Sequence, residues 1–392
     1  MLRIRRGRCL RLLLYLLFLF SLFYIHLKYN EQTSKPAAPA IRYSTRPTYE
    51  YTSLYRTNAN NTFEVLLDAQ LSALEQILRS SFPRNEQSLI ANRTIWQITT
   101  LKEAETWASW VSQWRDNNQE WFYHLYTSPP TELLQLFSTT PEIATAYQTI
   151  PAIRKDLLKY ILLWYYGGFY AEIDTWARMG MRDCRPIISV VQGRRNVSLM
   201  VGVDIDEPYL SQSTIREWGW TRGFSFGQYV IWAPKRFDPI LRKAIVRTIS
   251  HGMTQQKLSS RTWMQRYRSW KDGSRMEYME ELSGAGMFTD LVLEMLSKTL
   301  KDDHRLRDRD AGLEKRVTWK KFRASKRIIW VEPDDTKKES ENDMRGLSIV
   351  PINVWGSGQT HSGSGISDHN DACVNHVHGR RPRREWHERL FG

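Results

Sequence analysis

The sequence has few cysteines, no internal repeats and no second long apolar run. With only one apolar run, the chain has at most one membrane pass, which excludes a protein with several spanning helices. Of the three cysteines, Cys9 adjoins the apolar run near the N-terminus. Cys184 and Cys373 remain. An oxidising compartment would permit a disulfide between them, whereas two buried free thiols fit their spacing equally well.

The single apolar run follows a basic start. Five arginines precede residue 12, and residues 12–27 (LLLYLLFLFSLFYIHL) carry no charge. This run is slightly short for a bilayer, but the side chains of Arg11 and Lys28 can reach outward to the interface. No small-residue cleavage site follows Leu27 cleanly, so an uncleaved signal anchor is favoured over a signal peptide. We expect residues 1–11 to be a cytoplasmic tail and residues 12–27 a transmembrane segment.

The chain beyond the apolar run divides by composition. Residues 28–61 are rich in Thr, Ser, Pro, Asn and Tyr and show no apolar period, which is typical of an unfolded stem. Residues 62–392 then form a lumenal domain, because the chain is 41% hydrophobic and this part is long enough to bury a core. Asn60, Asn92 and Asn196 begin glycosylation sequons, which a lumenal location would expose to modification.

Helical and strand-like patterns alternate through this domain. Helical spacing of apolar residues occurs at 63–79, 101–115, 154–166, 239–249 and 288–300. Strand-like runs occur at 93–99, 120–127, 169–173, 199–206, 224–234, 327–333 and 347–355. This alternation favours an α/β domain with a mostly parallel sheet flanked by helices. Trp107, Trp110 and Trp114 recur at helical spacing, and packing in the core is the simplest interpretation of all three.

The net charge of +14 suggests a nucleic-acid binder at first. The charge gathers in a few runs, however, mainly the basic start and the terminal RRPRREWHER. A membrane anchor and dispersed aromatic residues also argue against that class. We therefore expect no nucleic-acid partner, and interpret the basic end as a solvated segment or one that docks in a complex.

A pair of acids follows a buried strand in RKDLLKYILLWYYGGFYAEIDTWA, residues 154–177. Gly167 and Gly168 end the helix, because glycine enters the left-handed region freely. Glu172 and Asp174 then lie two residues apart at the carboxyl end of the strand, where open α/β sheets bind ligands. Two adjacent carboxylates repel unless a cation lies between them. The pattern predicts a Mg²⁺ or Mn²⁺ ion that bridges the protein to a diphosphate.

The block GGFYAEIDT resembles the DXD region of a sugar-transferase family, glycosyltransferase family thirty-two, and within it the fungal initiating α-1,6-mannosyltransferases of the Golgi. Six further segments resemble the family in the same order. They are IWQ (95–97), RKDLLKY (154–160), GVDID (202–206), GFSFGQYVIWAPKRFDPIL (223–241), LSGAGMFTD (282–290) and VNHVHG (374–379). The resemblance therefore covers nearly all of the domain.

This resemblance implies a GT-A-type, Rossmann-like fold, GDP-mannose as donor, and retention at the anomeric carbon. It also implies a divalent metal, with Mn²⁺ favoured, and a mannose-containing N-glycan as acceptor in the Golgi lumen. By position, the implied metal ligands are Glu172, Asp174 and His376, with His378 as an alternative to His376. The implied donor-binding residues are Trp96, Gln97, Asp156 and Lys159, and the candidates on the acceptor side are Asp204 and Asp206. No residue is assigned as a catalytic nucleophile.

Three positions depart from the family pattern. Glu172 replaces the first Asp of the motif, Lys159 replaces an Arg that would bind in bidentate fashion, and the chain lacks the family's GSW ending. Two other functions remain open. One is an inositol-phosphorylceramide mannosyltransferase, although such relatives are expected to carry further membrane spans after the catalytic block. The other is a non-catalytic lectin or partner subunit of a mannosyltransferase complex.

Overall fold

The computed structural model describes residues 17–22, 24, 43, 53–81, 93–128, 131–259, 279–310, 316–333, 344–359 and 361–376. The chain divides into two units between Tyr43 and Ser44. In the first unit, residues 17–22 are helical. Within the described residues, no helix has the length and apolar character needed to cross a membrane. Most of the predicted anchor at 12–27 lies outside these residues, so it stays a prediction.

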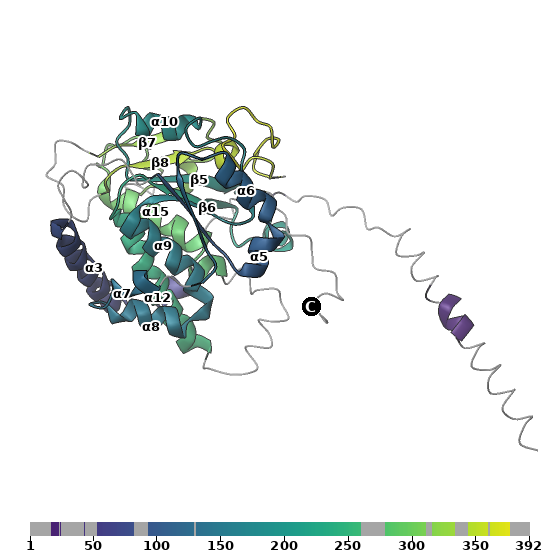
Figure 1. Cartoon of the computed structure of the whole chain (residues 1–392), viewed down its shortest axis with the longest axis horizontal. Helices are drawn as coiled ribbons and strands as arrows, with labels where there is room; N and C mark the ends of the chain where they lie inside the picture. The colour runs from purple at the N-terminus through teal and green to yellow at the C-terminus, as the bar shows by residue number, and fades with distance from the viewer. Residues whose placement is uncertain are drawn as a thin grey trace, which may run out of the picture. The chain divides into compact units, whose positions relative to one another are not determined.

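A seven-stranded mixed sheet forms the centre of the second unit (Figure 1). Its strands lie in the order β2-β1-β3-β6-β5-β8-β7. Their bounds are β1 (Thr94–Ile98), β2 (Phe122–Tyr126), β3 (Gly168–Ala171), β5 (Leu199–Asp206), β6 (Phe224–Ala233), β7 (Ile329–Val331) and β8 (Leu347–Val350).

The expectation of a mostly parallel sheet is only partly met. Of the six neighbouring pairs, β1–β2, β1–β3 and β5–β8 are parallel, whereas β3–β6, β5–β6 and β7–β8 are antiparallel. The strand β6 is antiparallel to β5. The connection between them contains only the short helix α11 (Gln212–Glu217) and makes no full crossover, so the chain returns in the opposite direction. The carboxyl ends of β1, β3 and β5 still meet at one edge.

Helices cover both faces of the sheet, because neighbouring strand residues point to opposite faces. Trp96 and Val201 belong to one core cluster, while Ile95 and Met200 belong to the other. The first face is covered by α3 (Asn61–Ser81), α8 (Pro141–Thr149), α9 (Arg154–Tyr166), α12 (Pro239–Ser259) and α15 (Ala285–Thr299). The second is covered by α6 (Ala108–Asp116), α10 (Arg185–Val191) and α16 (Ile352–Trp355).

Local sequence explains several helix boundaries. Thr100 and Glu103 form a capping box that starts α5 (Leu101–Thr106), and Trp107 separates it from α6, so the predicted helix 101–115 is two helices. Asp238 accepts hydrogen bonds from the amides of Ile240 and Leu241 at the start of α12. That helix extends ten residues beyond the predicted end at 249. The short helix α7 spans Thr131–Gln135.

The double glycine after α9 is required by backbone shape and by space. Gly167 and Gly168 have φ values of 72° and 99°. A Cβ atom on Gly168 would lie 2.6 Å from the indole nitrogen of Trp96 and 2.8 Å from the carbonyl oxygen of Thr94. The chain therefore passes closely against β1 before it enters β3, which fixes where the acidic motif emerges.

The folded unit begins earlier than the predicted stem boundary at residue 61. Helix α2 spans Leu54–Thr57, and the side chain of Tyr55 is buried in the first core cluster. Its ring lies 5.7 Å from that of His251 on α12. Because Tyr55 is buried in the core, residues 53–58 belong to the fold and not to the stem. The polar composition of the stretch did not indicate this.

A second, two-stranded sheet joins distant parts of the chain. Strand β4 (Thr175–Ala177) pairs antiparallel with β9 (Val374–His376), a strand that the sequence did not predict. A disulfide joins Cys184 to Cys373 with Cα atoms 5.5 Å apart, and it closes a sequence separation of 189 residues. The C-terminal part of the domain is thus fixed beside the acidic motif.

Candidate functional site

The backbone of the acidic motif is held in place by three neighbours. The amide of Glu172 donates to the carbonyl oxygen of Tyr229 at 2.8 Å. The carbonyl oxygen of Glu172 accepts from Gln97 Nε2 at 3.1 Å and from Thr175 Oγ1 at 2.6 Å. These bonds come from β1, β6 and β4, so the position of the motif is set by the main sheet and the small sheet together.

The carboxylate of Glu172 faces two lysines of α9. Its Oε2 lies 3.3 Å from Lys155 Nζ, and its Oε1 lies 3.9 Å from Lys159 Nζ. The negative charge of Glu172 is the main cause that raises the pKa of Lys155, with Asp174 and Asp156 adding to it. Lys155 was not singled out from the sequence, although it precedes Lys159 by one helical turn and so lies on the same face of the helix.

Lys159 is fully buried between two elements. Its Nζ donates to Asp156 Oδ1 and to Gln228 Oε1, both at 2.9 Å. Asp156 in turn accepts from Ser283 Oγ at 2.6 Å. The predicted donor-binding pair Asp156 and Lys159 therefore lies beside Glu172, as part of a polar network that links α9 to β6 and to the segment before α15.

A second network connects Asp174 to Asp204. Pairing of β4 with β9 places His376 opposite Thr175, and His376 Nε2 lies 3.8 Å from Asp174 Oδ2. Gln359 Nε2 lies 3.0 Å from His376 Nδ1 and 3.4 Å from Asp204 Oδ1. Nothing in the sequence pointed to Gln359. It joins the predicted metal and acceptor candidates into one group.

Burial and charge oppose each other at the imidazole of His376. Burial lowers the pKa of His376, but Asp174, Asp204 and Glu172 together outweigh it, so that the pKa is raised. Burial raises the pKa of the Asp204 carboxyl, and His376 offsets part of that rise. The ring of Tyr229 stacks on the imidazole at 4.1 Å. This group thus favours positive charge close to Asp174.

Trp96 and Gln97 lie behind the site instead of in an open nucleotide pocket. Trp96 is 5% exposed, and its indole N–H donates to the carbonyl oxygen of Gly167 at 2.8 Å. Gln97 is fully buried, and its Oε1 accepts from Tyr123 at 2.5 Å. Because β1 lies directly beside β3 in the sheet, both side chains support the glycine turn and the backbone of the acidic motif.

The two acids at the end of β5 have different surroundings. Asp206 accepts from the amide of Ala324, and its own amide donates to Ser362, so it lies apart from the Asp204 network. Glu280, which the sequence did not indicate, accepts from Thr221 Oγ1 at 2.8 Å. Burial raises the pKa of Glu280 to about 7, and the charge of Asp204 adds to the effect. Glu280 is therefore a further acid whose charge interacts with that of Asp204.

The donor atoms suit a divalent cation, but their arrangement is not a closed metal site. Among the described residues, no group of three or more His, Cys, Asp or Glu side chains is placed to hold a metal ion. Asp174 and His376 supply oxygen and nitrogen ligands of the kind Mn²⁺ takes. The carboxylate of Glu172 would have to rotate away from Lys155 to become a ligand of the same ion. His378 lies outside the described residues.

The predicted glycosylation positions that are described lie at the surface. Asn60 and Asn196 are exposed, whereas Asn92 lies outside the described residues. The side chain of Asn60 accepts from the amide of Phe63 at 3.1 Å, next to the start of α3. Their modification stays a prediction.

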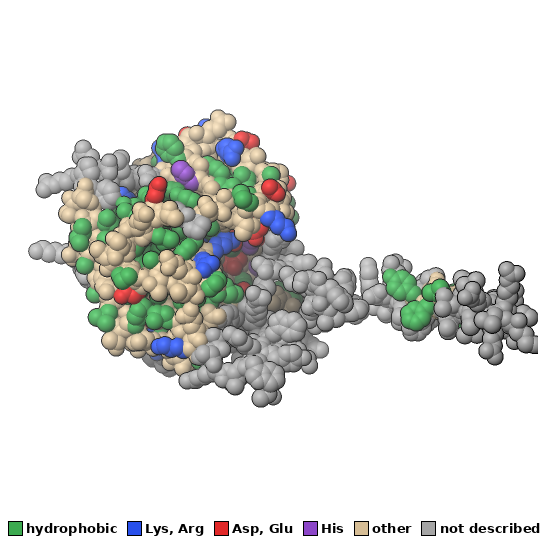
Figure 2. Space-filling model, turned by 60° about the horizontal axis from the view of Figure 1, so that its bottom comes forward, with side chains coloured by type: hydrophobic (Ala, Val, Ile, Leu, Met, Phe, Trp, Pro, Cys, Tyr) green, Lys and Arg blue, Asp and Glu red, His purple; other side chains and the backbone are tan. Residues whose placement is uncertain are grey.

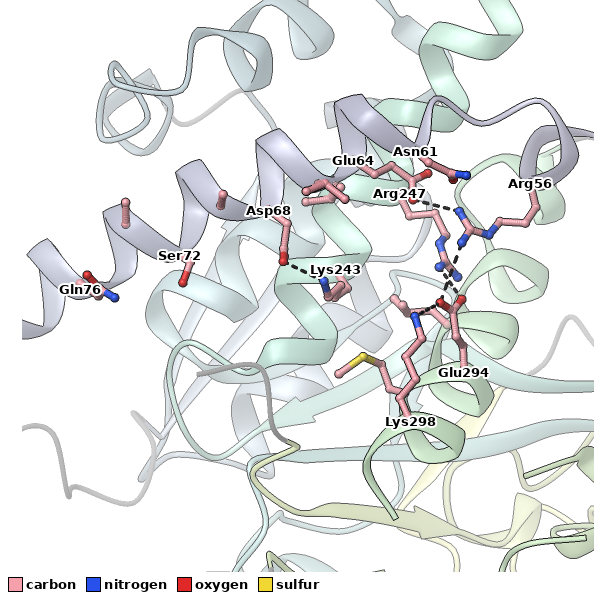
Figure 3. A pocket seen from close by; sticks show the side chains of 16 residues that line it. Arg56, Asn61, Glu64, Asp68, Ser72, Gln76, Lys243, Arg247, Glu294 and Lys298 are labelled. Atoms are coloured by element: carbon pink, nitrogen blue, oxygen red, sulfur yellow. Dashed lines mark hydrogen bonds and ion pairs between the residues drawn. The ribbon is translucent and has the colours of Figure 1, made fainter. Parts of the chain in front are cut away.

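A groove of about 700 Å³ lies on another part of the domain, between α3, α12 and α15 (Figure 3). Its charged side chains pair with one another. Arg56 lies 2.9 Å from Glu64, Lys243 lies 2.7 Å from Asp68, and Arg247 lies 2.6 Å from Glu294. The groove lacks the acid surplus found beside Glu172, so its chemistry does not favour it as the catalytic site.

The charged side chains on one face of the molecule are mixed in sign. In Figure 2, the Lys and Arg side chains of the described residues lie singly or in small groups among hydrophobic and uncharged ones. That face therefore offers no support for the nucleic-acid interpretation of the net charge.

Comparisons with known proteins bear on this site. Residues 104–189 match the family model described as "Glycosyltransferase sugar-binding region containing DXD motif". An initiation-specific alpha-1,6-mannosyltransferase from Candida albicans is 24% identical over 67% of this chain and 67% of its own length. A putative glycosyltransferase, HOC1, from Saccharomyces cerevisiae is 28% identical over 47% of this chain and 41% of its own length.

Two further likenesses are more limited. An initiation-specific alpha-1,6-mannosyltransferase from Schizosaccharomyces pombe is 23% identical over 52% of this chain and 48% of its own length. The matches to this protein and to HOC1 thus span less than half of each relative. The solved structure of the PaToxG glycosyltransferase shares 13% identity over 60% of this chain and 80% of that one, with a TM-score of 0.33. A TM-score this low does not identify a shared fold.

The matched region holds the core of the site. Residues 104–189 include α9 with its two lysines, the double glycine, and both Glu172 and Asp174. Asp204, Gln359 and His376 lie beyond it. The comparisons support a mannosyltransferase enzyme, and by sequence this chain is similar to fungal α-1,6-mannosyltransferases.

Proposed function

We propose that this chain is a metal-dependent Golgi mannosyltransferase, which transfers mannose from GDP-mannose to a mannose-containing N-glycan, with α-1,6 linkage and retention. The observation that supports this most directly is the convergence of Glu172, Asp174 and His376 with two lysines at the carboxyl end of β3. It lies at the edge where α/β sheets bind nucleotides, and its centre falls in the region matched by the sugar-transferase model.

The leaving diphosphate needs positive charge. Lys155 is 44% exposed in its side chain and therefore accessible to a ligand, while buried Lys159 holds Asp156 and faces Glu172. A divalent cation, when bound by Asp174 and His376 with Glu172, would supply further neutralisation of the diphosphate. The residues of this chain then act mainly by fixed electrostatics.

The acceptor hydroxyl that receives the mannose would lie near Asp204. Asp204 and Glu280 are carboxyl groups that burial makes easier to protonate, so either can hydrogen-bond a sugar hydroxyl. The donor sugar would pass through an oxocarbenium-like state, as in glycoside hydrolysis. The fold in this proposal is a GT-A variant in which β6 runs antiparallel at the centre.

The cellular arrangement in this proposal follows from the N-terminal sequence. Residues 1–11 face the cytosol, residues 12–27 anchor the chain in the Golgi membrane, and the polar stretch after them is a spacer. The catalytic unit then lies in the lumen, where the Cys184–Cys373 disulfide is stable.

The proposal is tested with the purified full chain. We would measure transfer from GDP-mannose and other nucleotide sugars to a high-mannose N-glycan and to inositol phosphorylceramide, with Mn²⁺ or with EDTA. We expect mannose transfer to the N-glycan only, loss with EDTA, and an α-1,6 bond in the product. Transfer to the lipid alone would instead establish the sphingolipid enzyme.

A lectin or partner subunit is the second candidate. It is favoured by the contacts of Glu172 with two lysines, which leave the motif closed to a metal in the arrangement described. High-mannose glycan binding without transfer and without metal-dependent binding of any nucleotide sugar, from a chain with a normal unfolding transition, would establish this second function.

A further inference from the structure

Three tryptophans lie together beside the acidic motif. Trp107 joins α5 to α6, Trp110 belongs to α6, and Trp176 belongs to β4. The rings of Trp107 and Trp110 are stacked with centroids 4.3 Å apart, and Trp176 meets Trp110 edge-on at 5.2 Å. All three residues are half-buried. We call these three residues the tryptophan shelf.

The shelf is not part of either core cluster. Trp114, one turn after Trp110, is fully buried, and its indole N–H donates to Thr175 at 2.9 Å. Trp107, Trp110 and Trp176 belong to none of the hydrophobic clusters formed by the described residues. The sequence-based expectation of core packing is therefore met only by Trp114. Three adjoining indoles that remain partly exposed indicate a surface for a ligand or partner.

The shelf is continuous with the site. Trp176 follows Asp174 by two residues, and its strand pairs with β9, which carries His376. The helix α5 begins three residues after Ile98 in β1, the strand whose Gln97 bonds to Glu172. The indole of Trp176 therefore belongs to the same small sheet as His376 and adjoins the acidic motif along the chain.

We propose that the tryptophan shelf binds mannose rings of the acceptor glycan, next to the residue that receives the new bond. The identity of the glycan rests on the function proposed above. The C–H face of a pyranose packs on an indole by dispersion and weak C–H contacts, and an indole N–H can bond a sugar hydroxyl. Such binding requires no charge.

The surroundings of the shelf fit an uncharged ligand. Ala108 and Ser109, which lie between Trp107 and Trp110, are exposed, small and uncharged, so no long side chain from this stretch covers the rings. The lysines that would attract a diphosphate lie instead on α9, beside Glu172. We assign the charged donor to these lysines and the neutral glycan to the shelf.

The test uses the full chain and four variants, Trp110→Ala, Trp110→Phe, Trp176→Ala and, as a control, Trp330→Ala. Trp330 is also half-buried but lies on β7, at the far edge of the sheet. The affinity for a free high-mannose oligosaccharide is measured by NMR titration without donor, and that for GDP-mannose by calorimetry. The KM for the glycan is measured separately.

We expect each alanine variant of the shelf to bind the oligosaccharide at least about fivefold more weakly and to raise the glycan KM, since each substitution removes one indole on which a sugar ring would pack. Trp110→Phe should recover part of the loss, and Trp330→Ala should bind as the parent does. The affinity for GDP-mannose should change by less than about twofold in every variant.

Two results overturn the proposal. One is unchanged oligosaccharide affinity in both alanine variants. The other is loss of GDP-mannose affinity with oligosaccharide affinity retained, which would place the guanine base on the indoles. Because glycan binding is measured without donor, a parent chain that binds the oligosaccharide through the shelf but transfers no mannose contradicts the proposed function alone. If Trp176→Ala does not fold, Trp110→Ala decides the outcome.

Discussion

The acidic edge beside β3 and the groove beside α3 differ in how their charged side chains are paired. In the groove, each acid has an Arg or Lys within hydrogen-bonding distance, as Asp68 has Lys243 and Glu294 has Arg247 (Figure 3). At the acidic edge, four carboxylates share two lysines and one imidazole. The acids are Asp156, Glu172, Asp174 and Asp204, and the basic groups are Lys155, Lys159 and His376.

The difference separates structure from binding. Arg242 of α12, which is fully buried, bonds to Asp68 at 3.1 Å and to Glu75 at 2.9 Å, and so fixes α3 to the domain. Its rigid fork suits two fixed acids. A surplus of carboxylates, by contrast, costs free energy until a cation joins it. We infer that the ion pairs along α3 stabilise the fold and that the acidic edge beside β3 binds ligands.

The largest expected effect is on activity. Asp174→Asn should lower kcat for mannose transfer by about 1,000-fold, because it removes a charge that would hold the proposed metal ion and, through it, the diphosphate. The midpoint of thermal unfolding should hardly move, since the side chain keeps its shape. Asp183→Asn, at an exposed acid outside the site, is the matched control. Equal activities of the two variants would remove Asp174 from the site.

The largest expected effect on stability lies in the other region. Arg242→Met should lower the free energy of unfolding by about 1.5–3 kcal/mol, because Asp68 and Glu75 would lose a fully buried partner. The loss is limited because Lys243 still pairs with Asp68, and Arg79 and Arg345 still pair with Glu75. Activity per folded molecule should stay the same. Arg195→Met is the control, because its pair with Glu332 is exposed and should matter little. Urea unfolding of both variants measures the difference, and equal losses would contradict the comparison.

A pH dependence of stability should arise beside α3. Burial, with help from Arg247, lowers the pKa of His251 to about 4. The folded state keeps His251 neutral, while the unfolded chain binds a proton below its usual pKa of about 6.5. The stability from this group is therefore complete above pH 6.5 and lost as the pH falls towards 4, by about 2 kcal/mol at pH 5.

The variant His251→Gln checks this assignment. It should flatten the fall in unfolding free energy between pH 6.5 and 5, as measured by urea titration at several pH values. A slope equal to that of the parent chain would mean that other groups cause the loss.

The smallest expected effect is at the rim of the groove. Lys298→Ala removes an ion pair with Glu294, but the lysine side chain is 66% exposed. The free energy of unfolding should fall by no more than about 0.5 kcal/mol, and 0.5 M salt should reduce even that difference. A loss above 1 kcal/mol would show that the groove depends on more than its buried pairs.

Local features of the sequence predicted the segment that leads into the acidic motif. The double glycine and the helix before it depend on short-range geometry, and the structure places them as expected. The sequence-based interpretation of Trp96 and Gln97 differed, because burial depends on β2 and α9 packing against β1. Local patterns carry little information on such contacts.

Features set by distant contacts were missed. The reversal of β6 depends on how the chain returns from β5, which alternation of strands and helices does not reveal. Gln359 was not indicated by the sequence, and it lies 3.0 Å from His376, which the β4–β9 pairing places at the site as the family resemblance had implied. The exposure of Trp107 and Trp110 could not be distinguished from core packing, because a helical spacing fits both.

Manganese binding tests the central claim most directly. The full chain would be titrated with Mn²⁺ in the presence of GDP, and free Mn²⁺ followed by electron paramagnetic resonance. The acid surplus at the β3 edge predicts one bound ion per chain, lost in Asp174→Asn and retained in Arg195→Met. Absence of binding to the parent chain, or equal binding to Asp174→Asn, would contradict the account that this edge gathers a cation and a diphosphate.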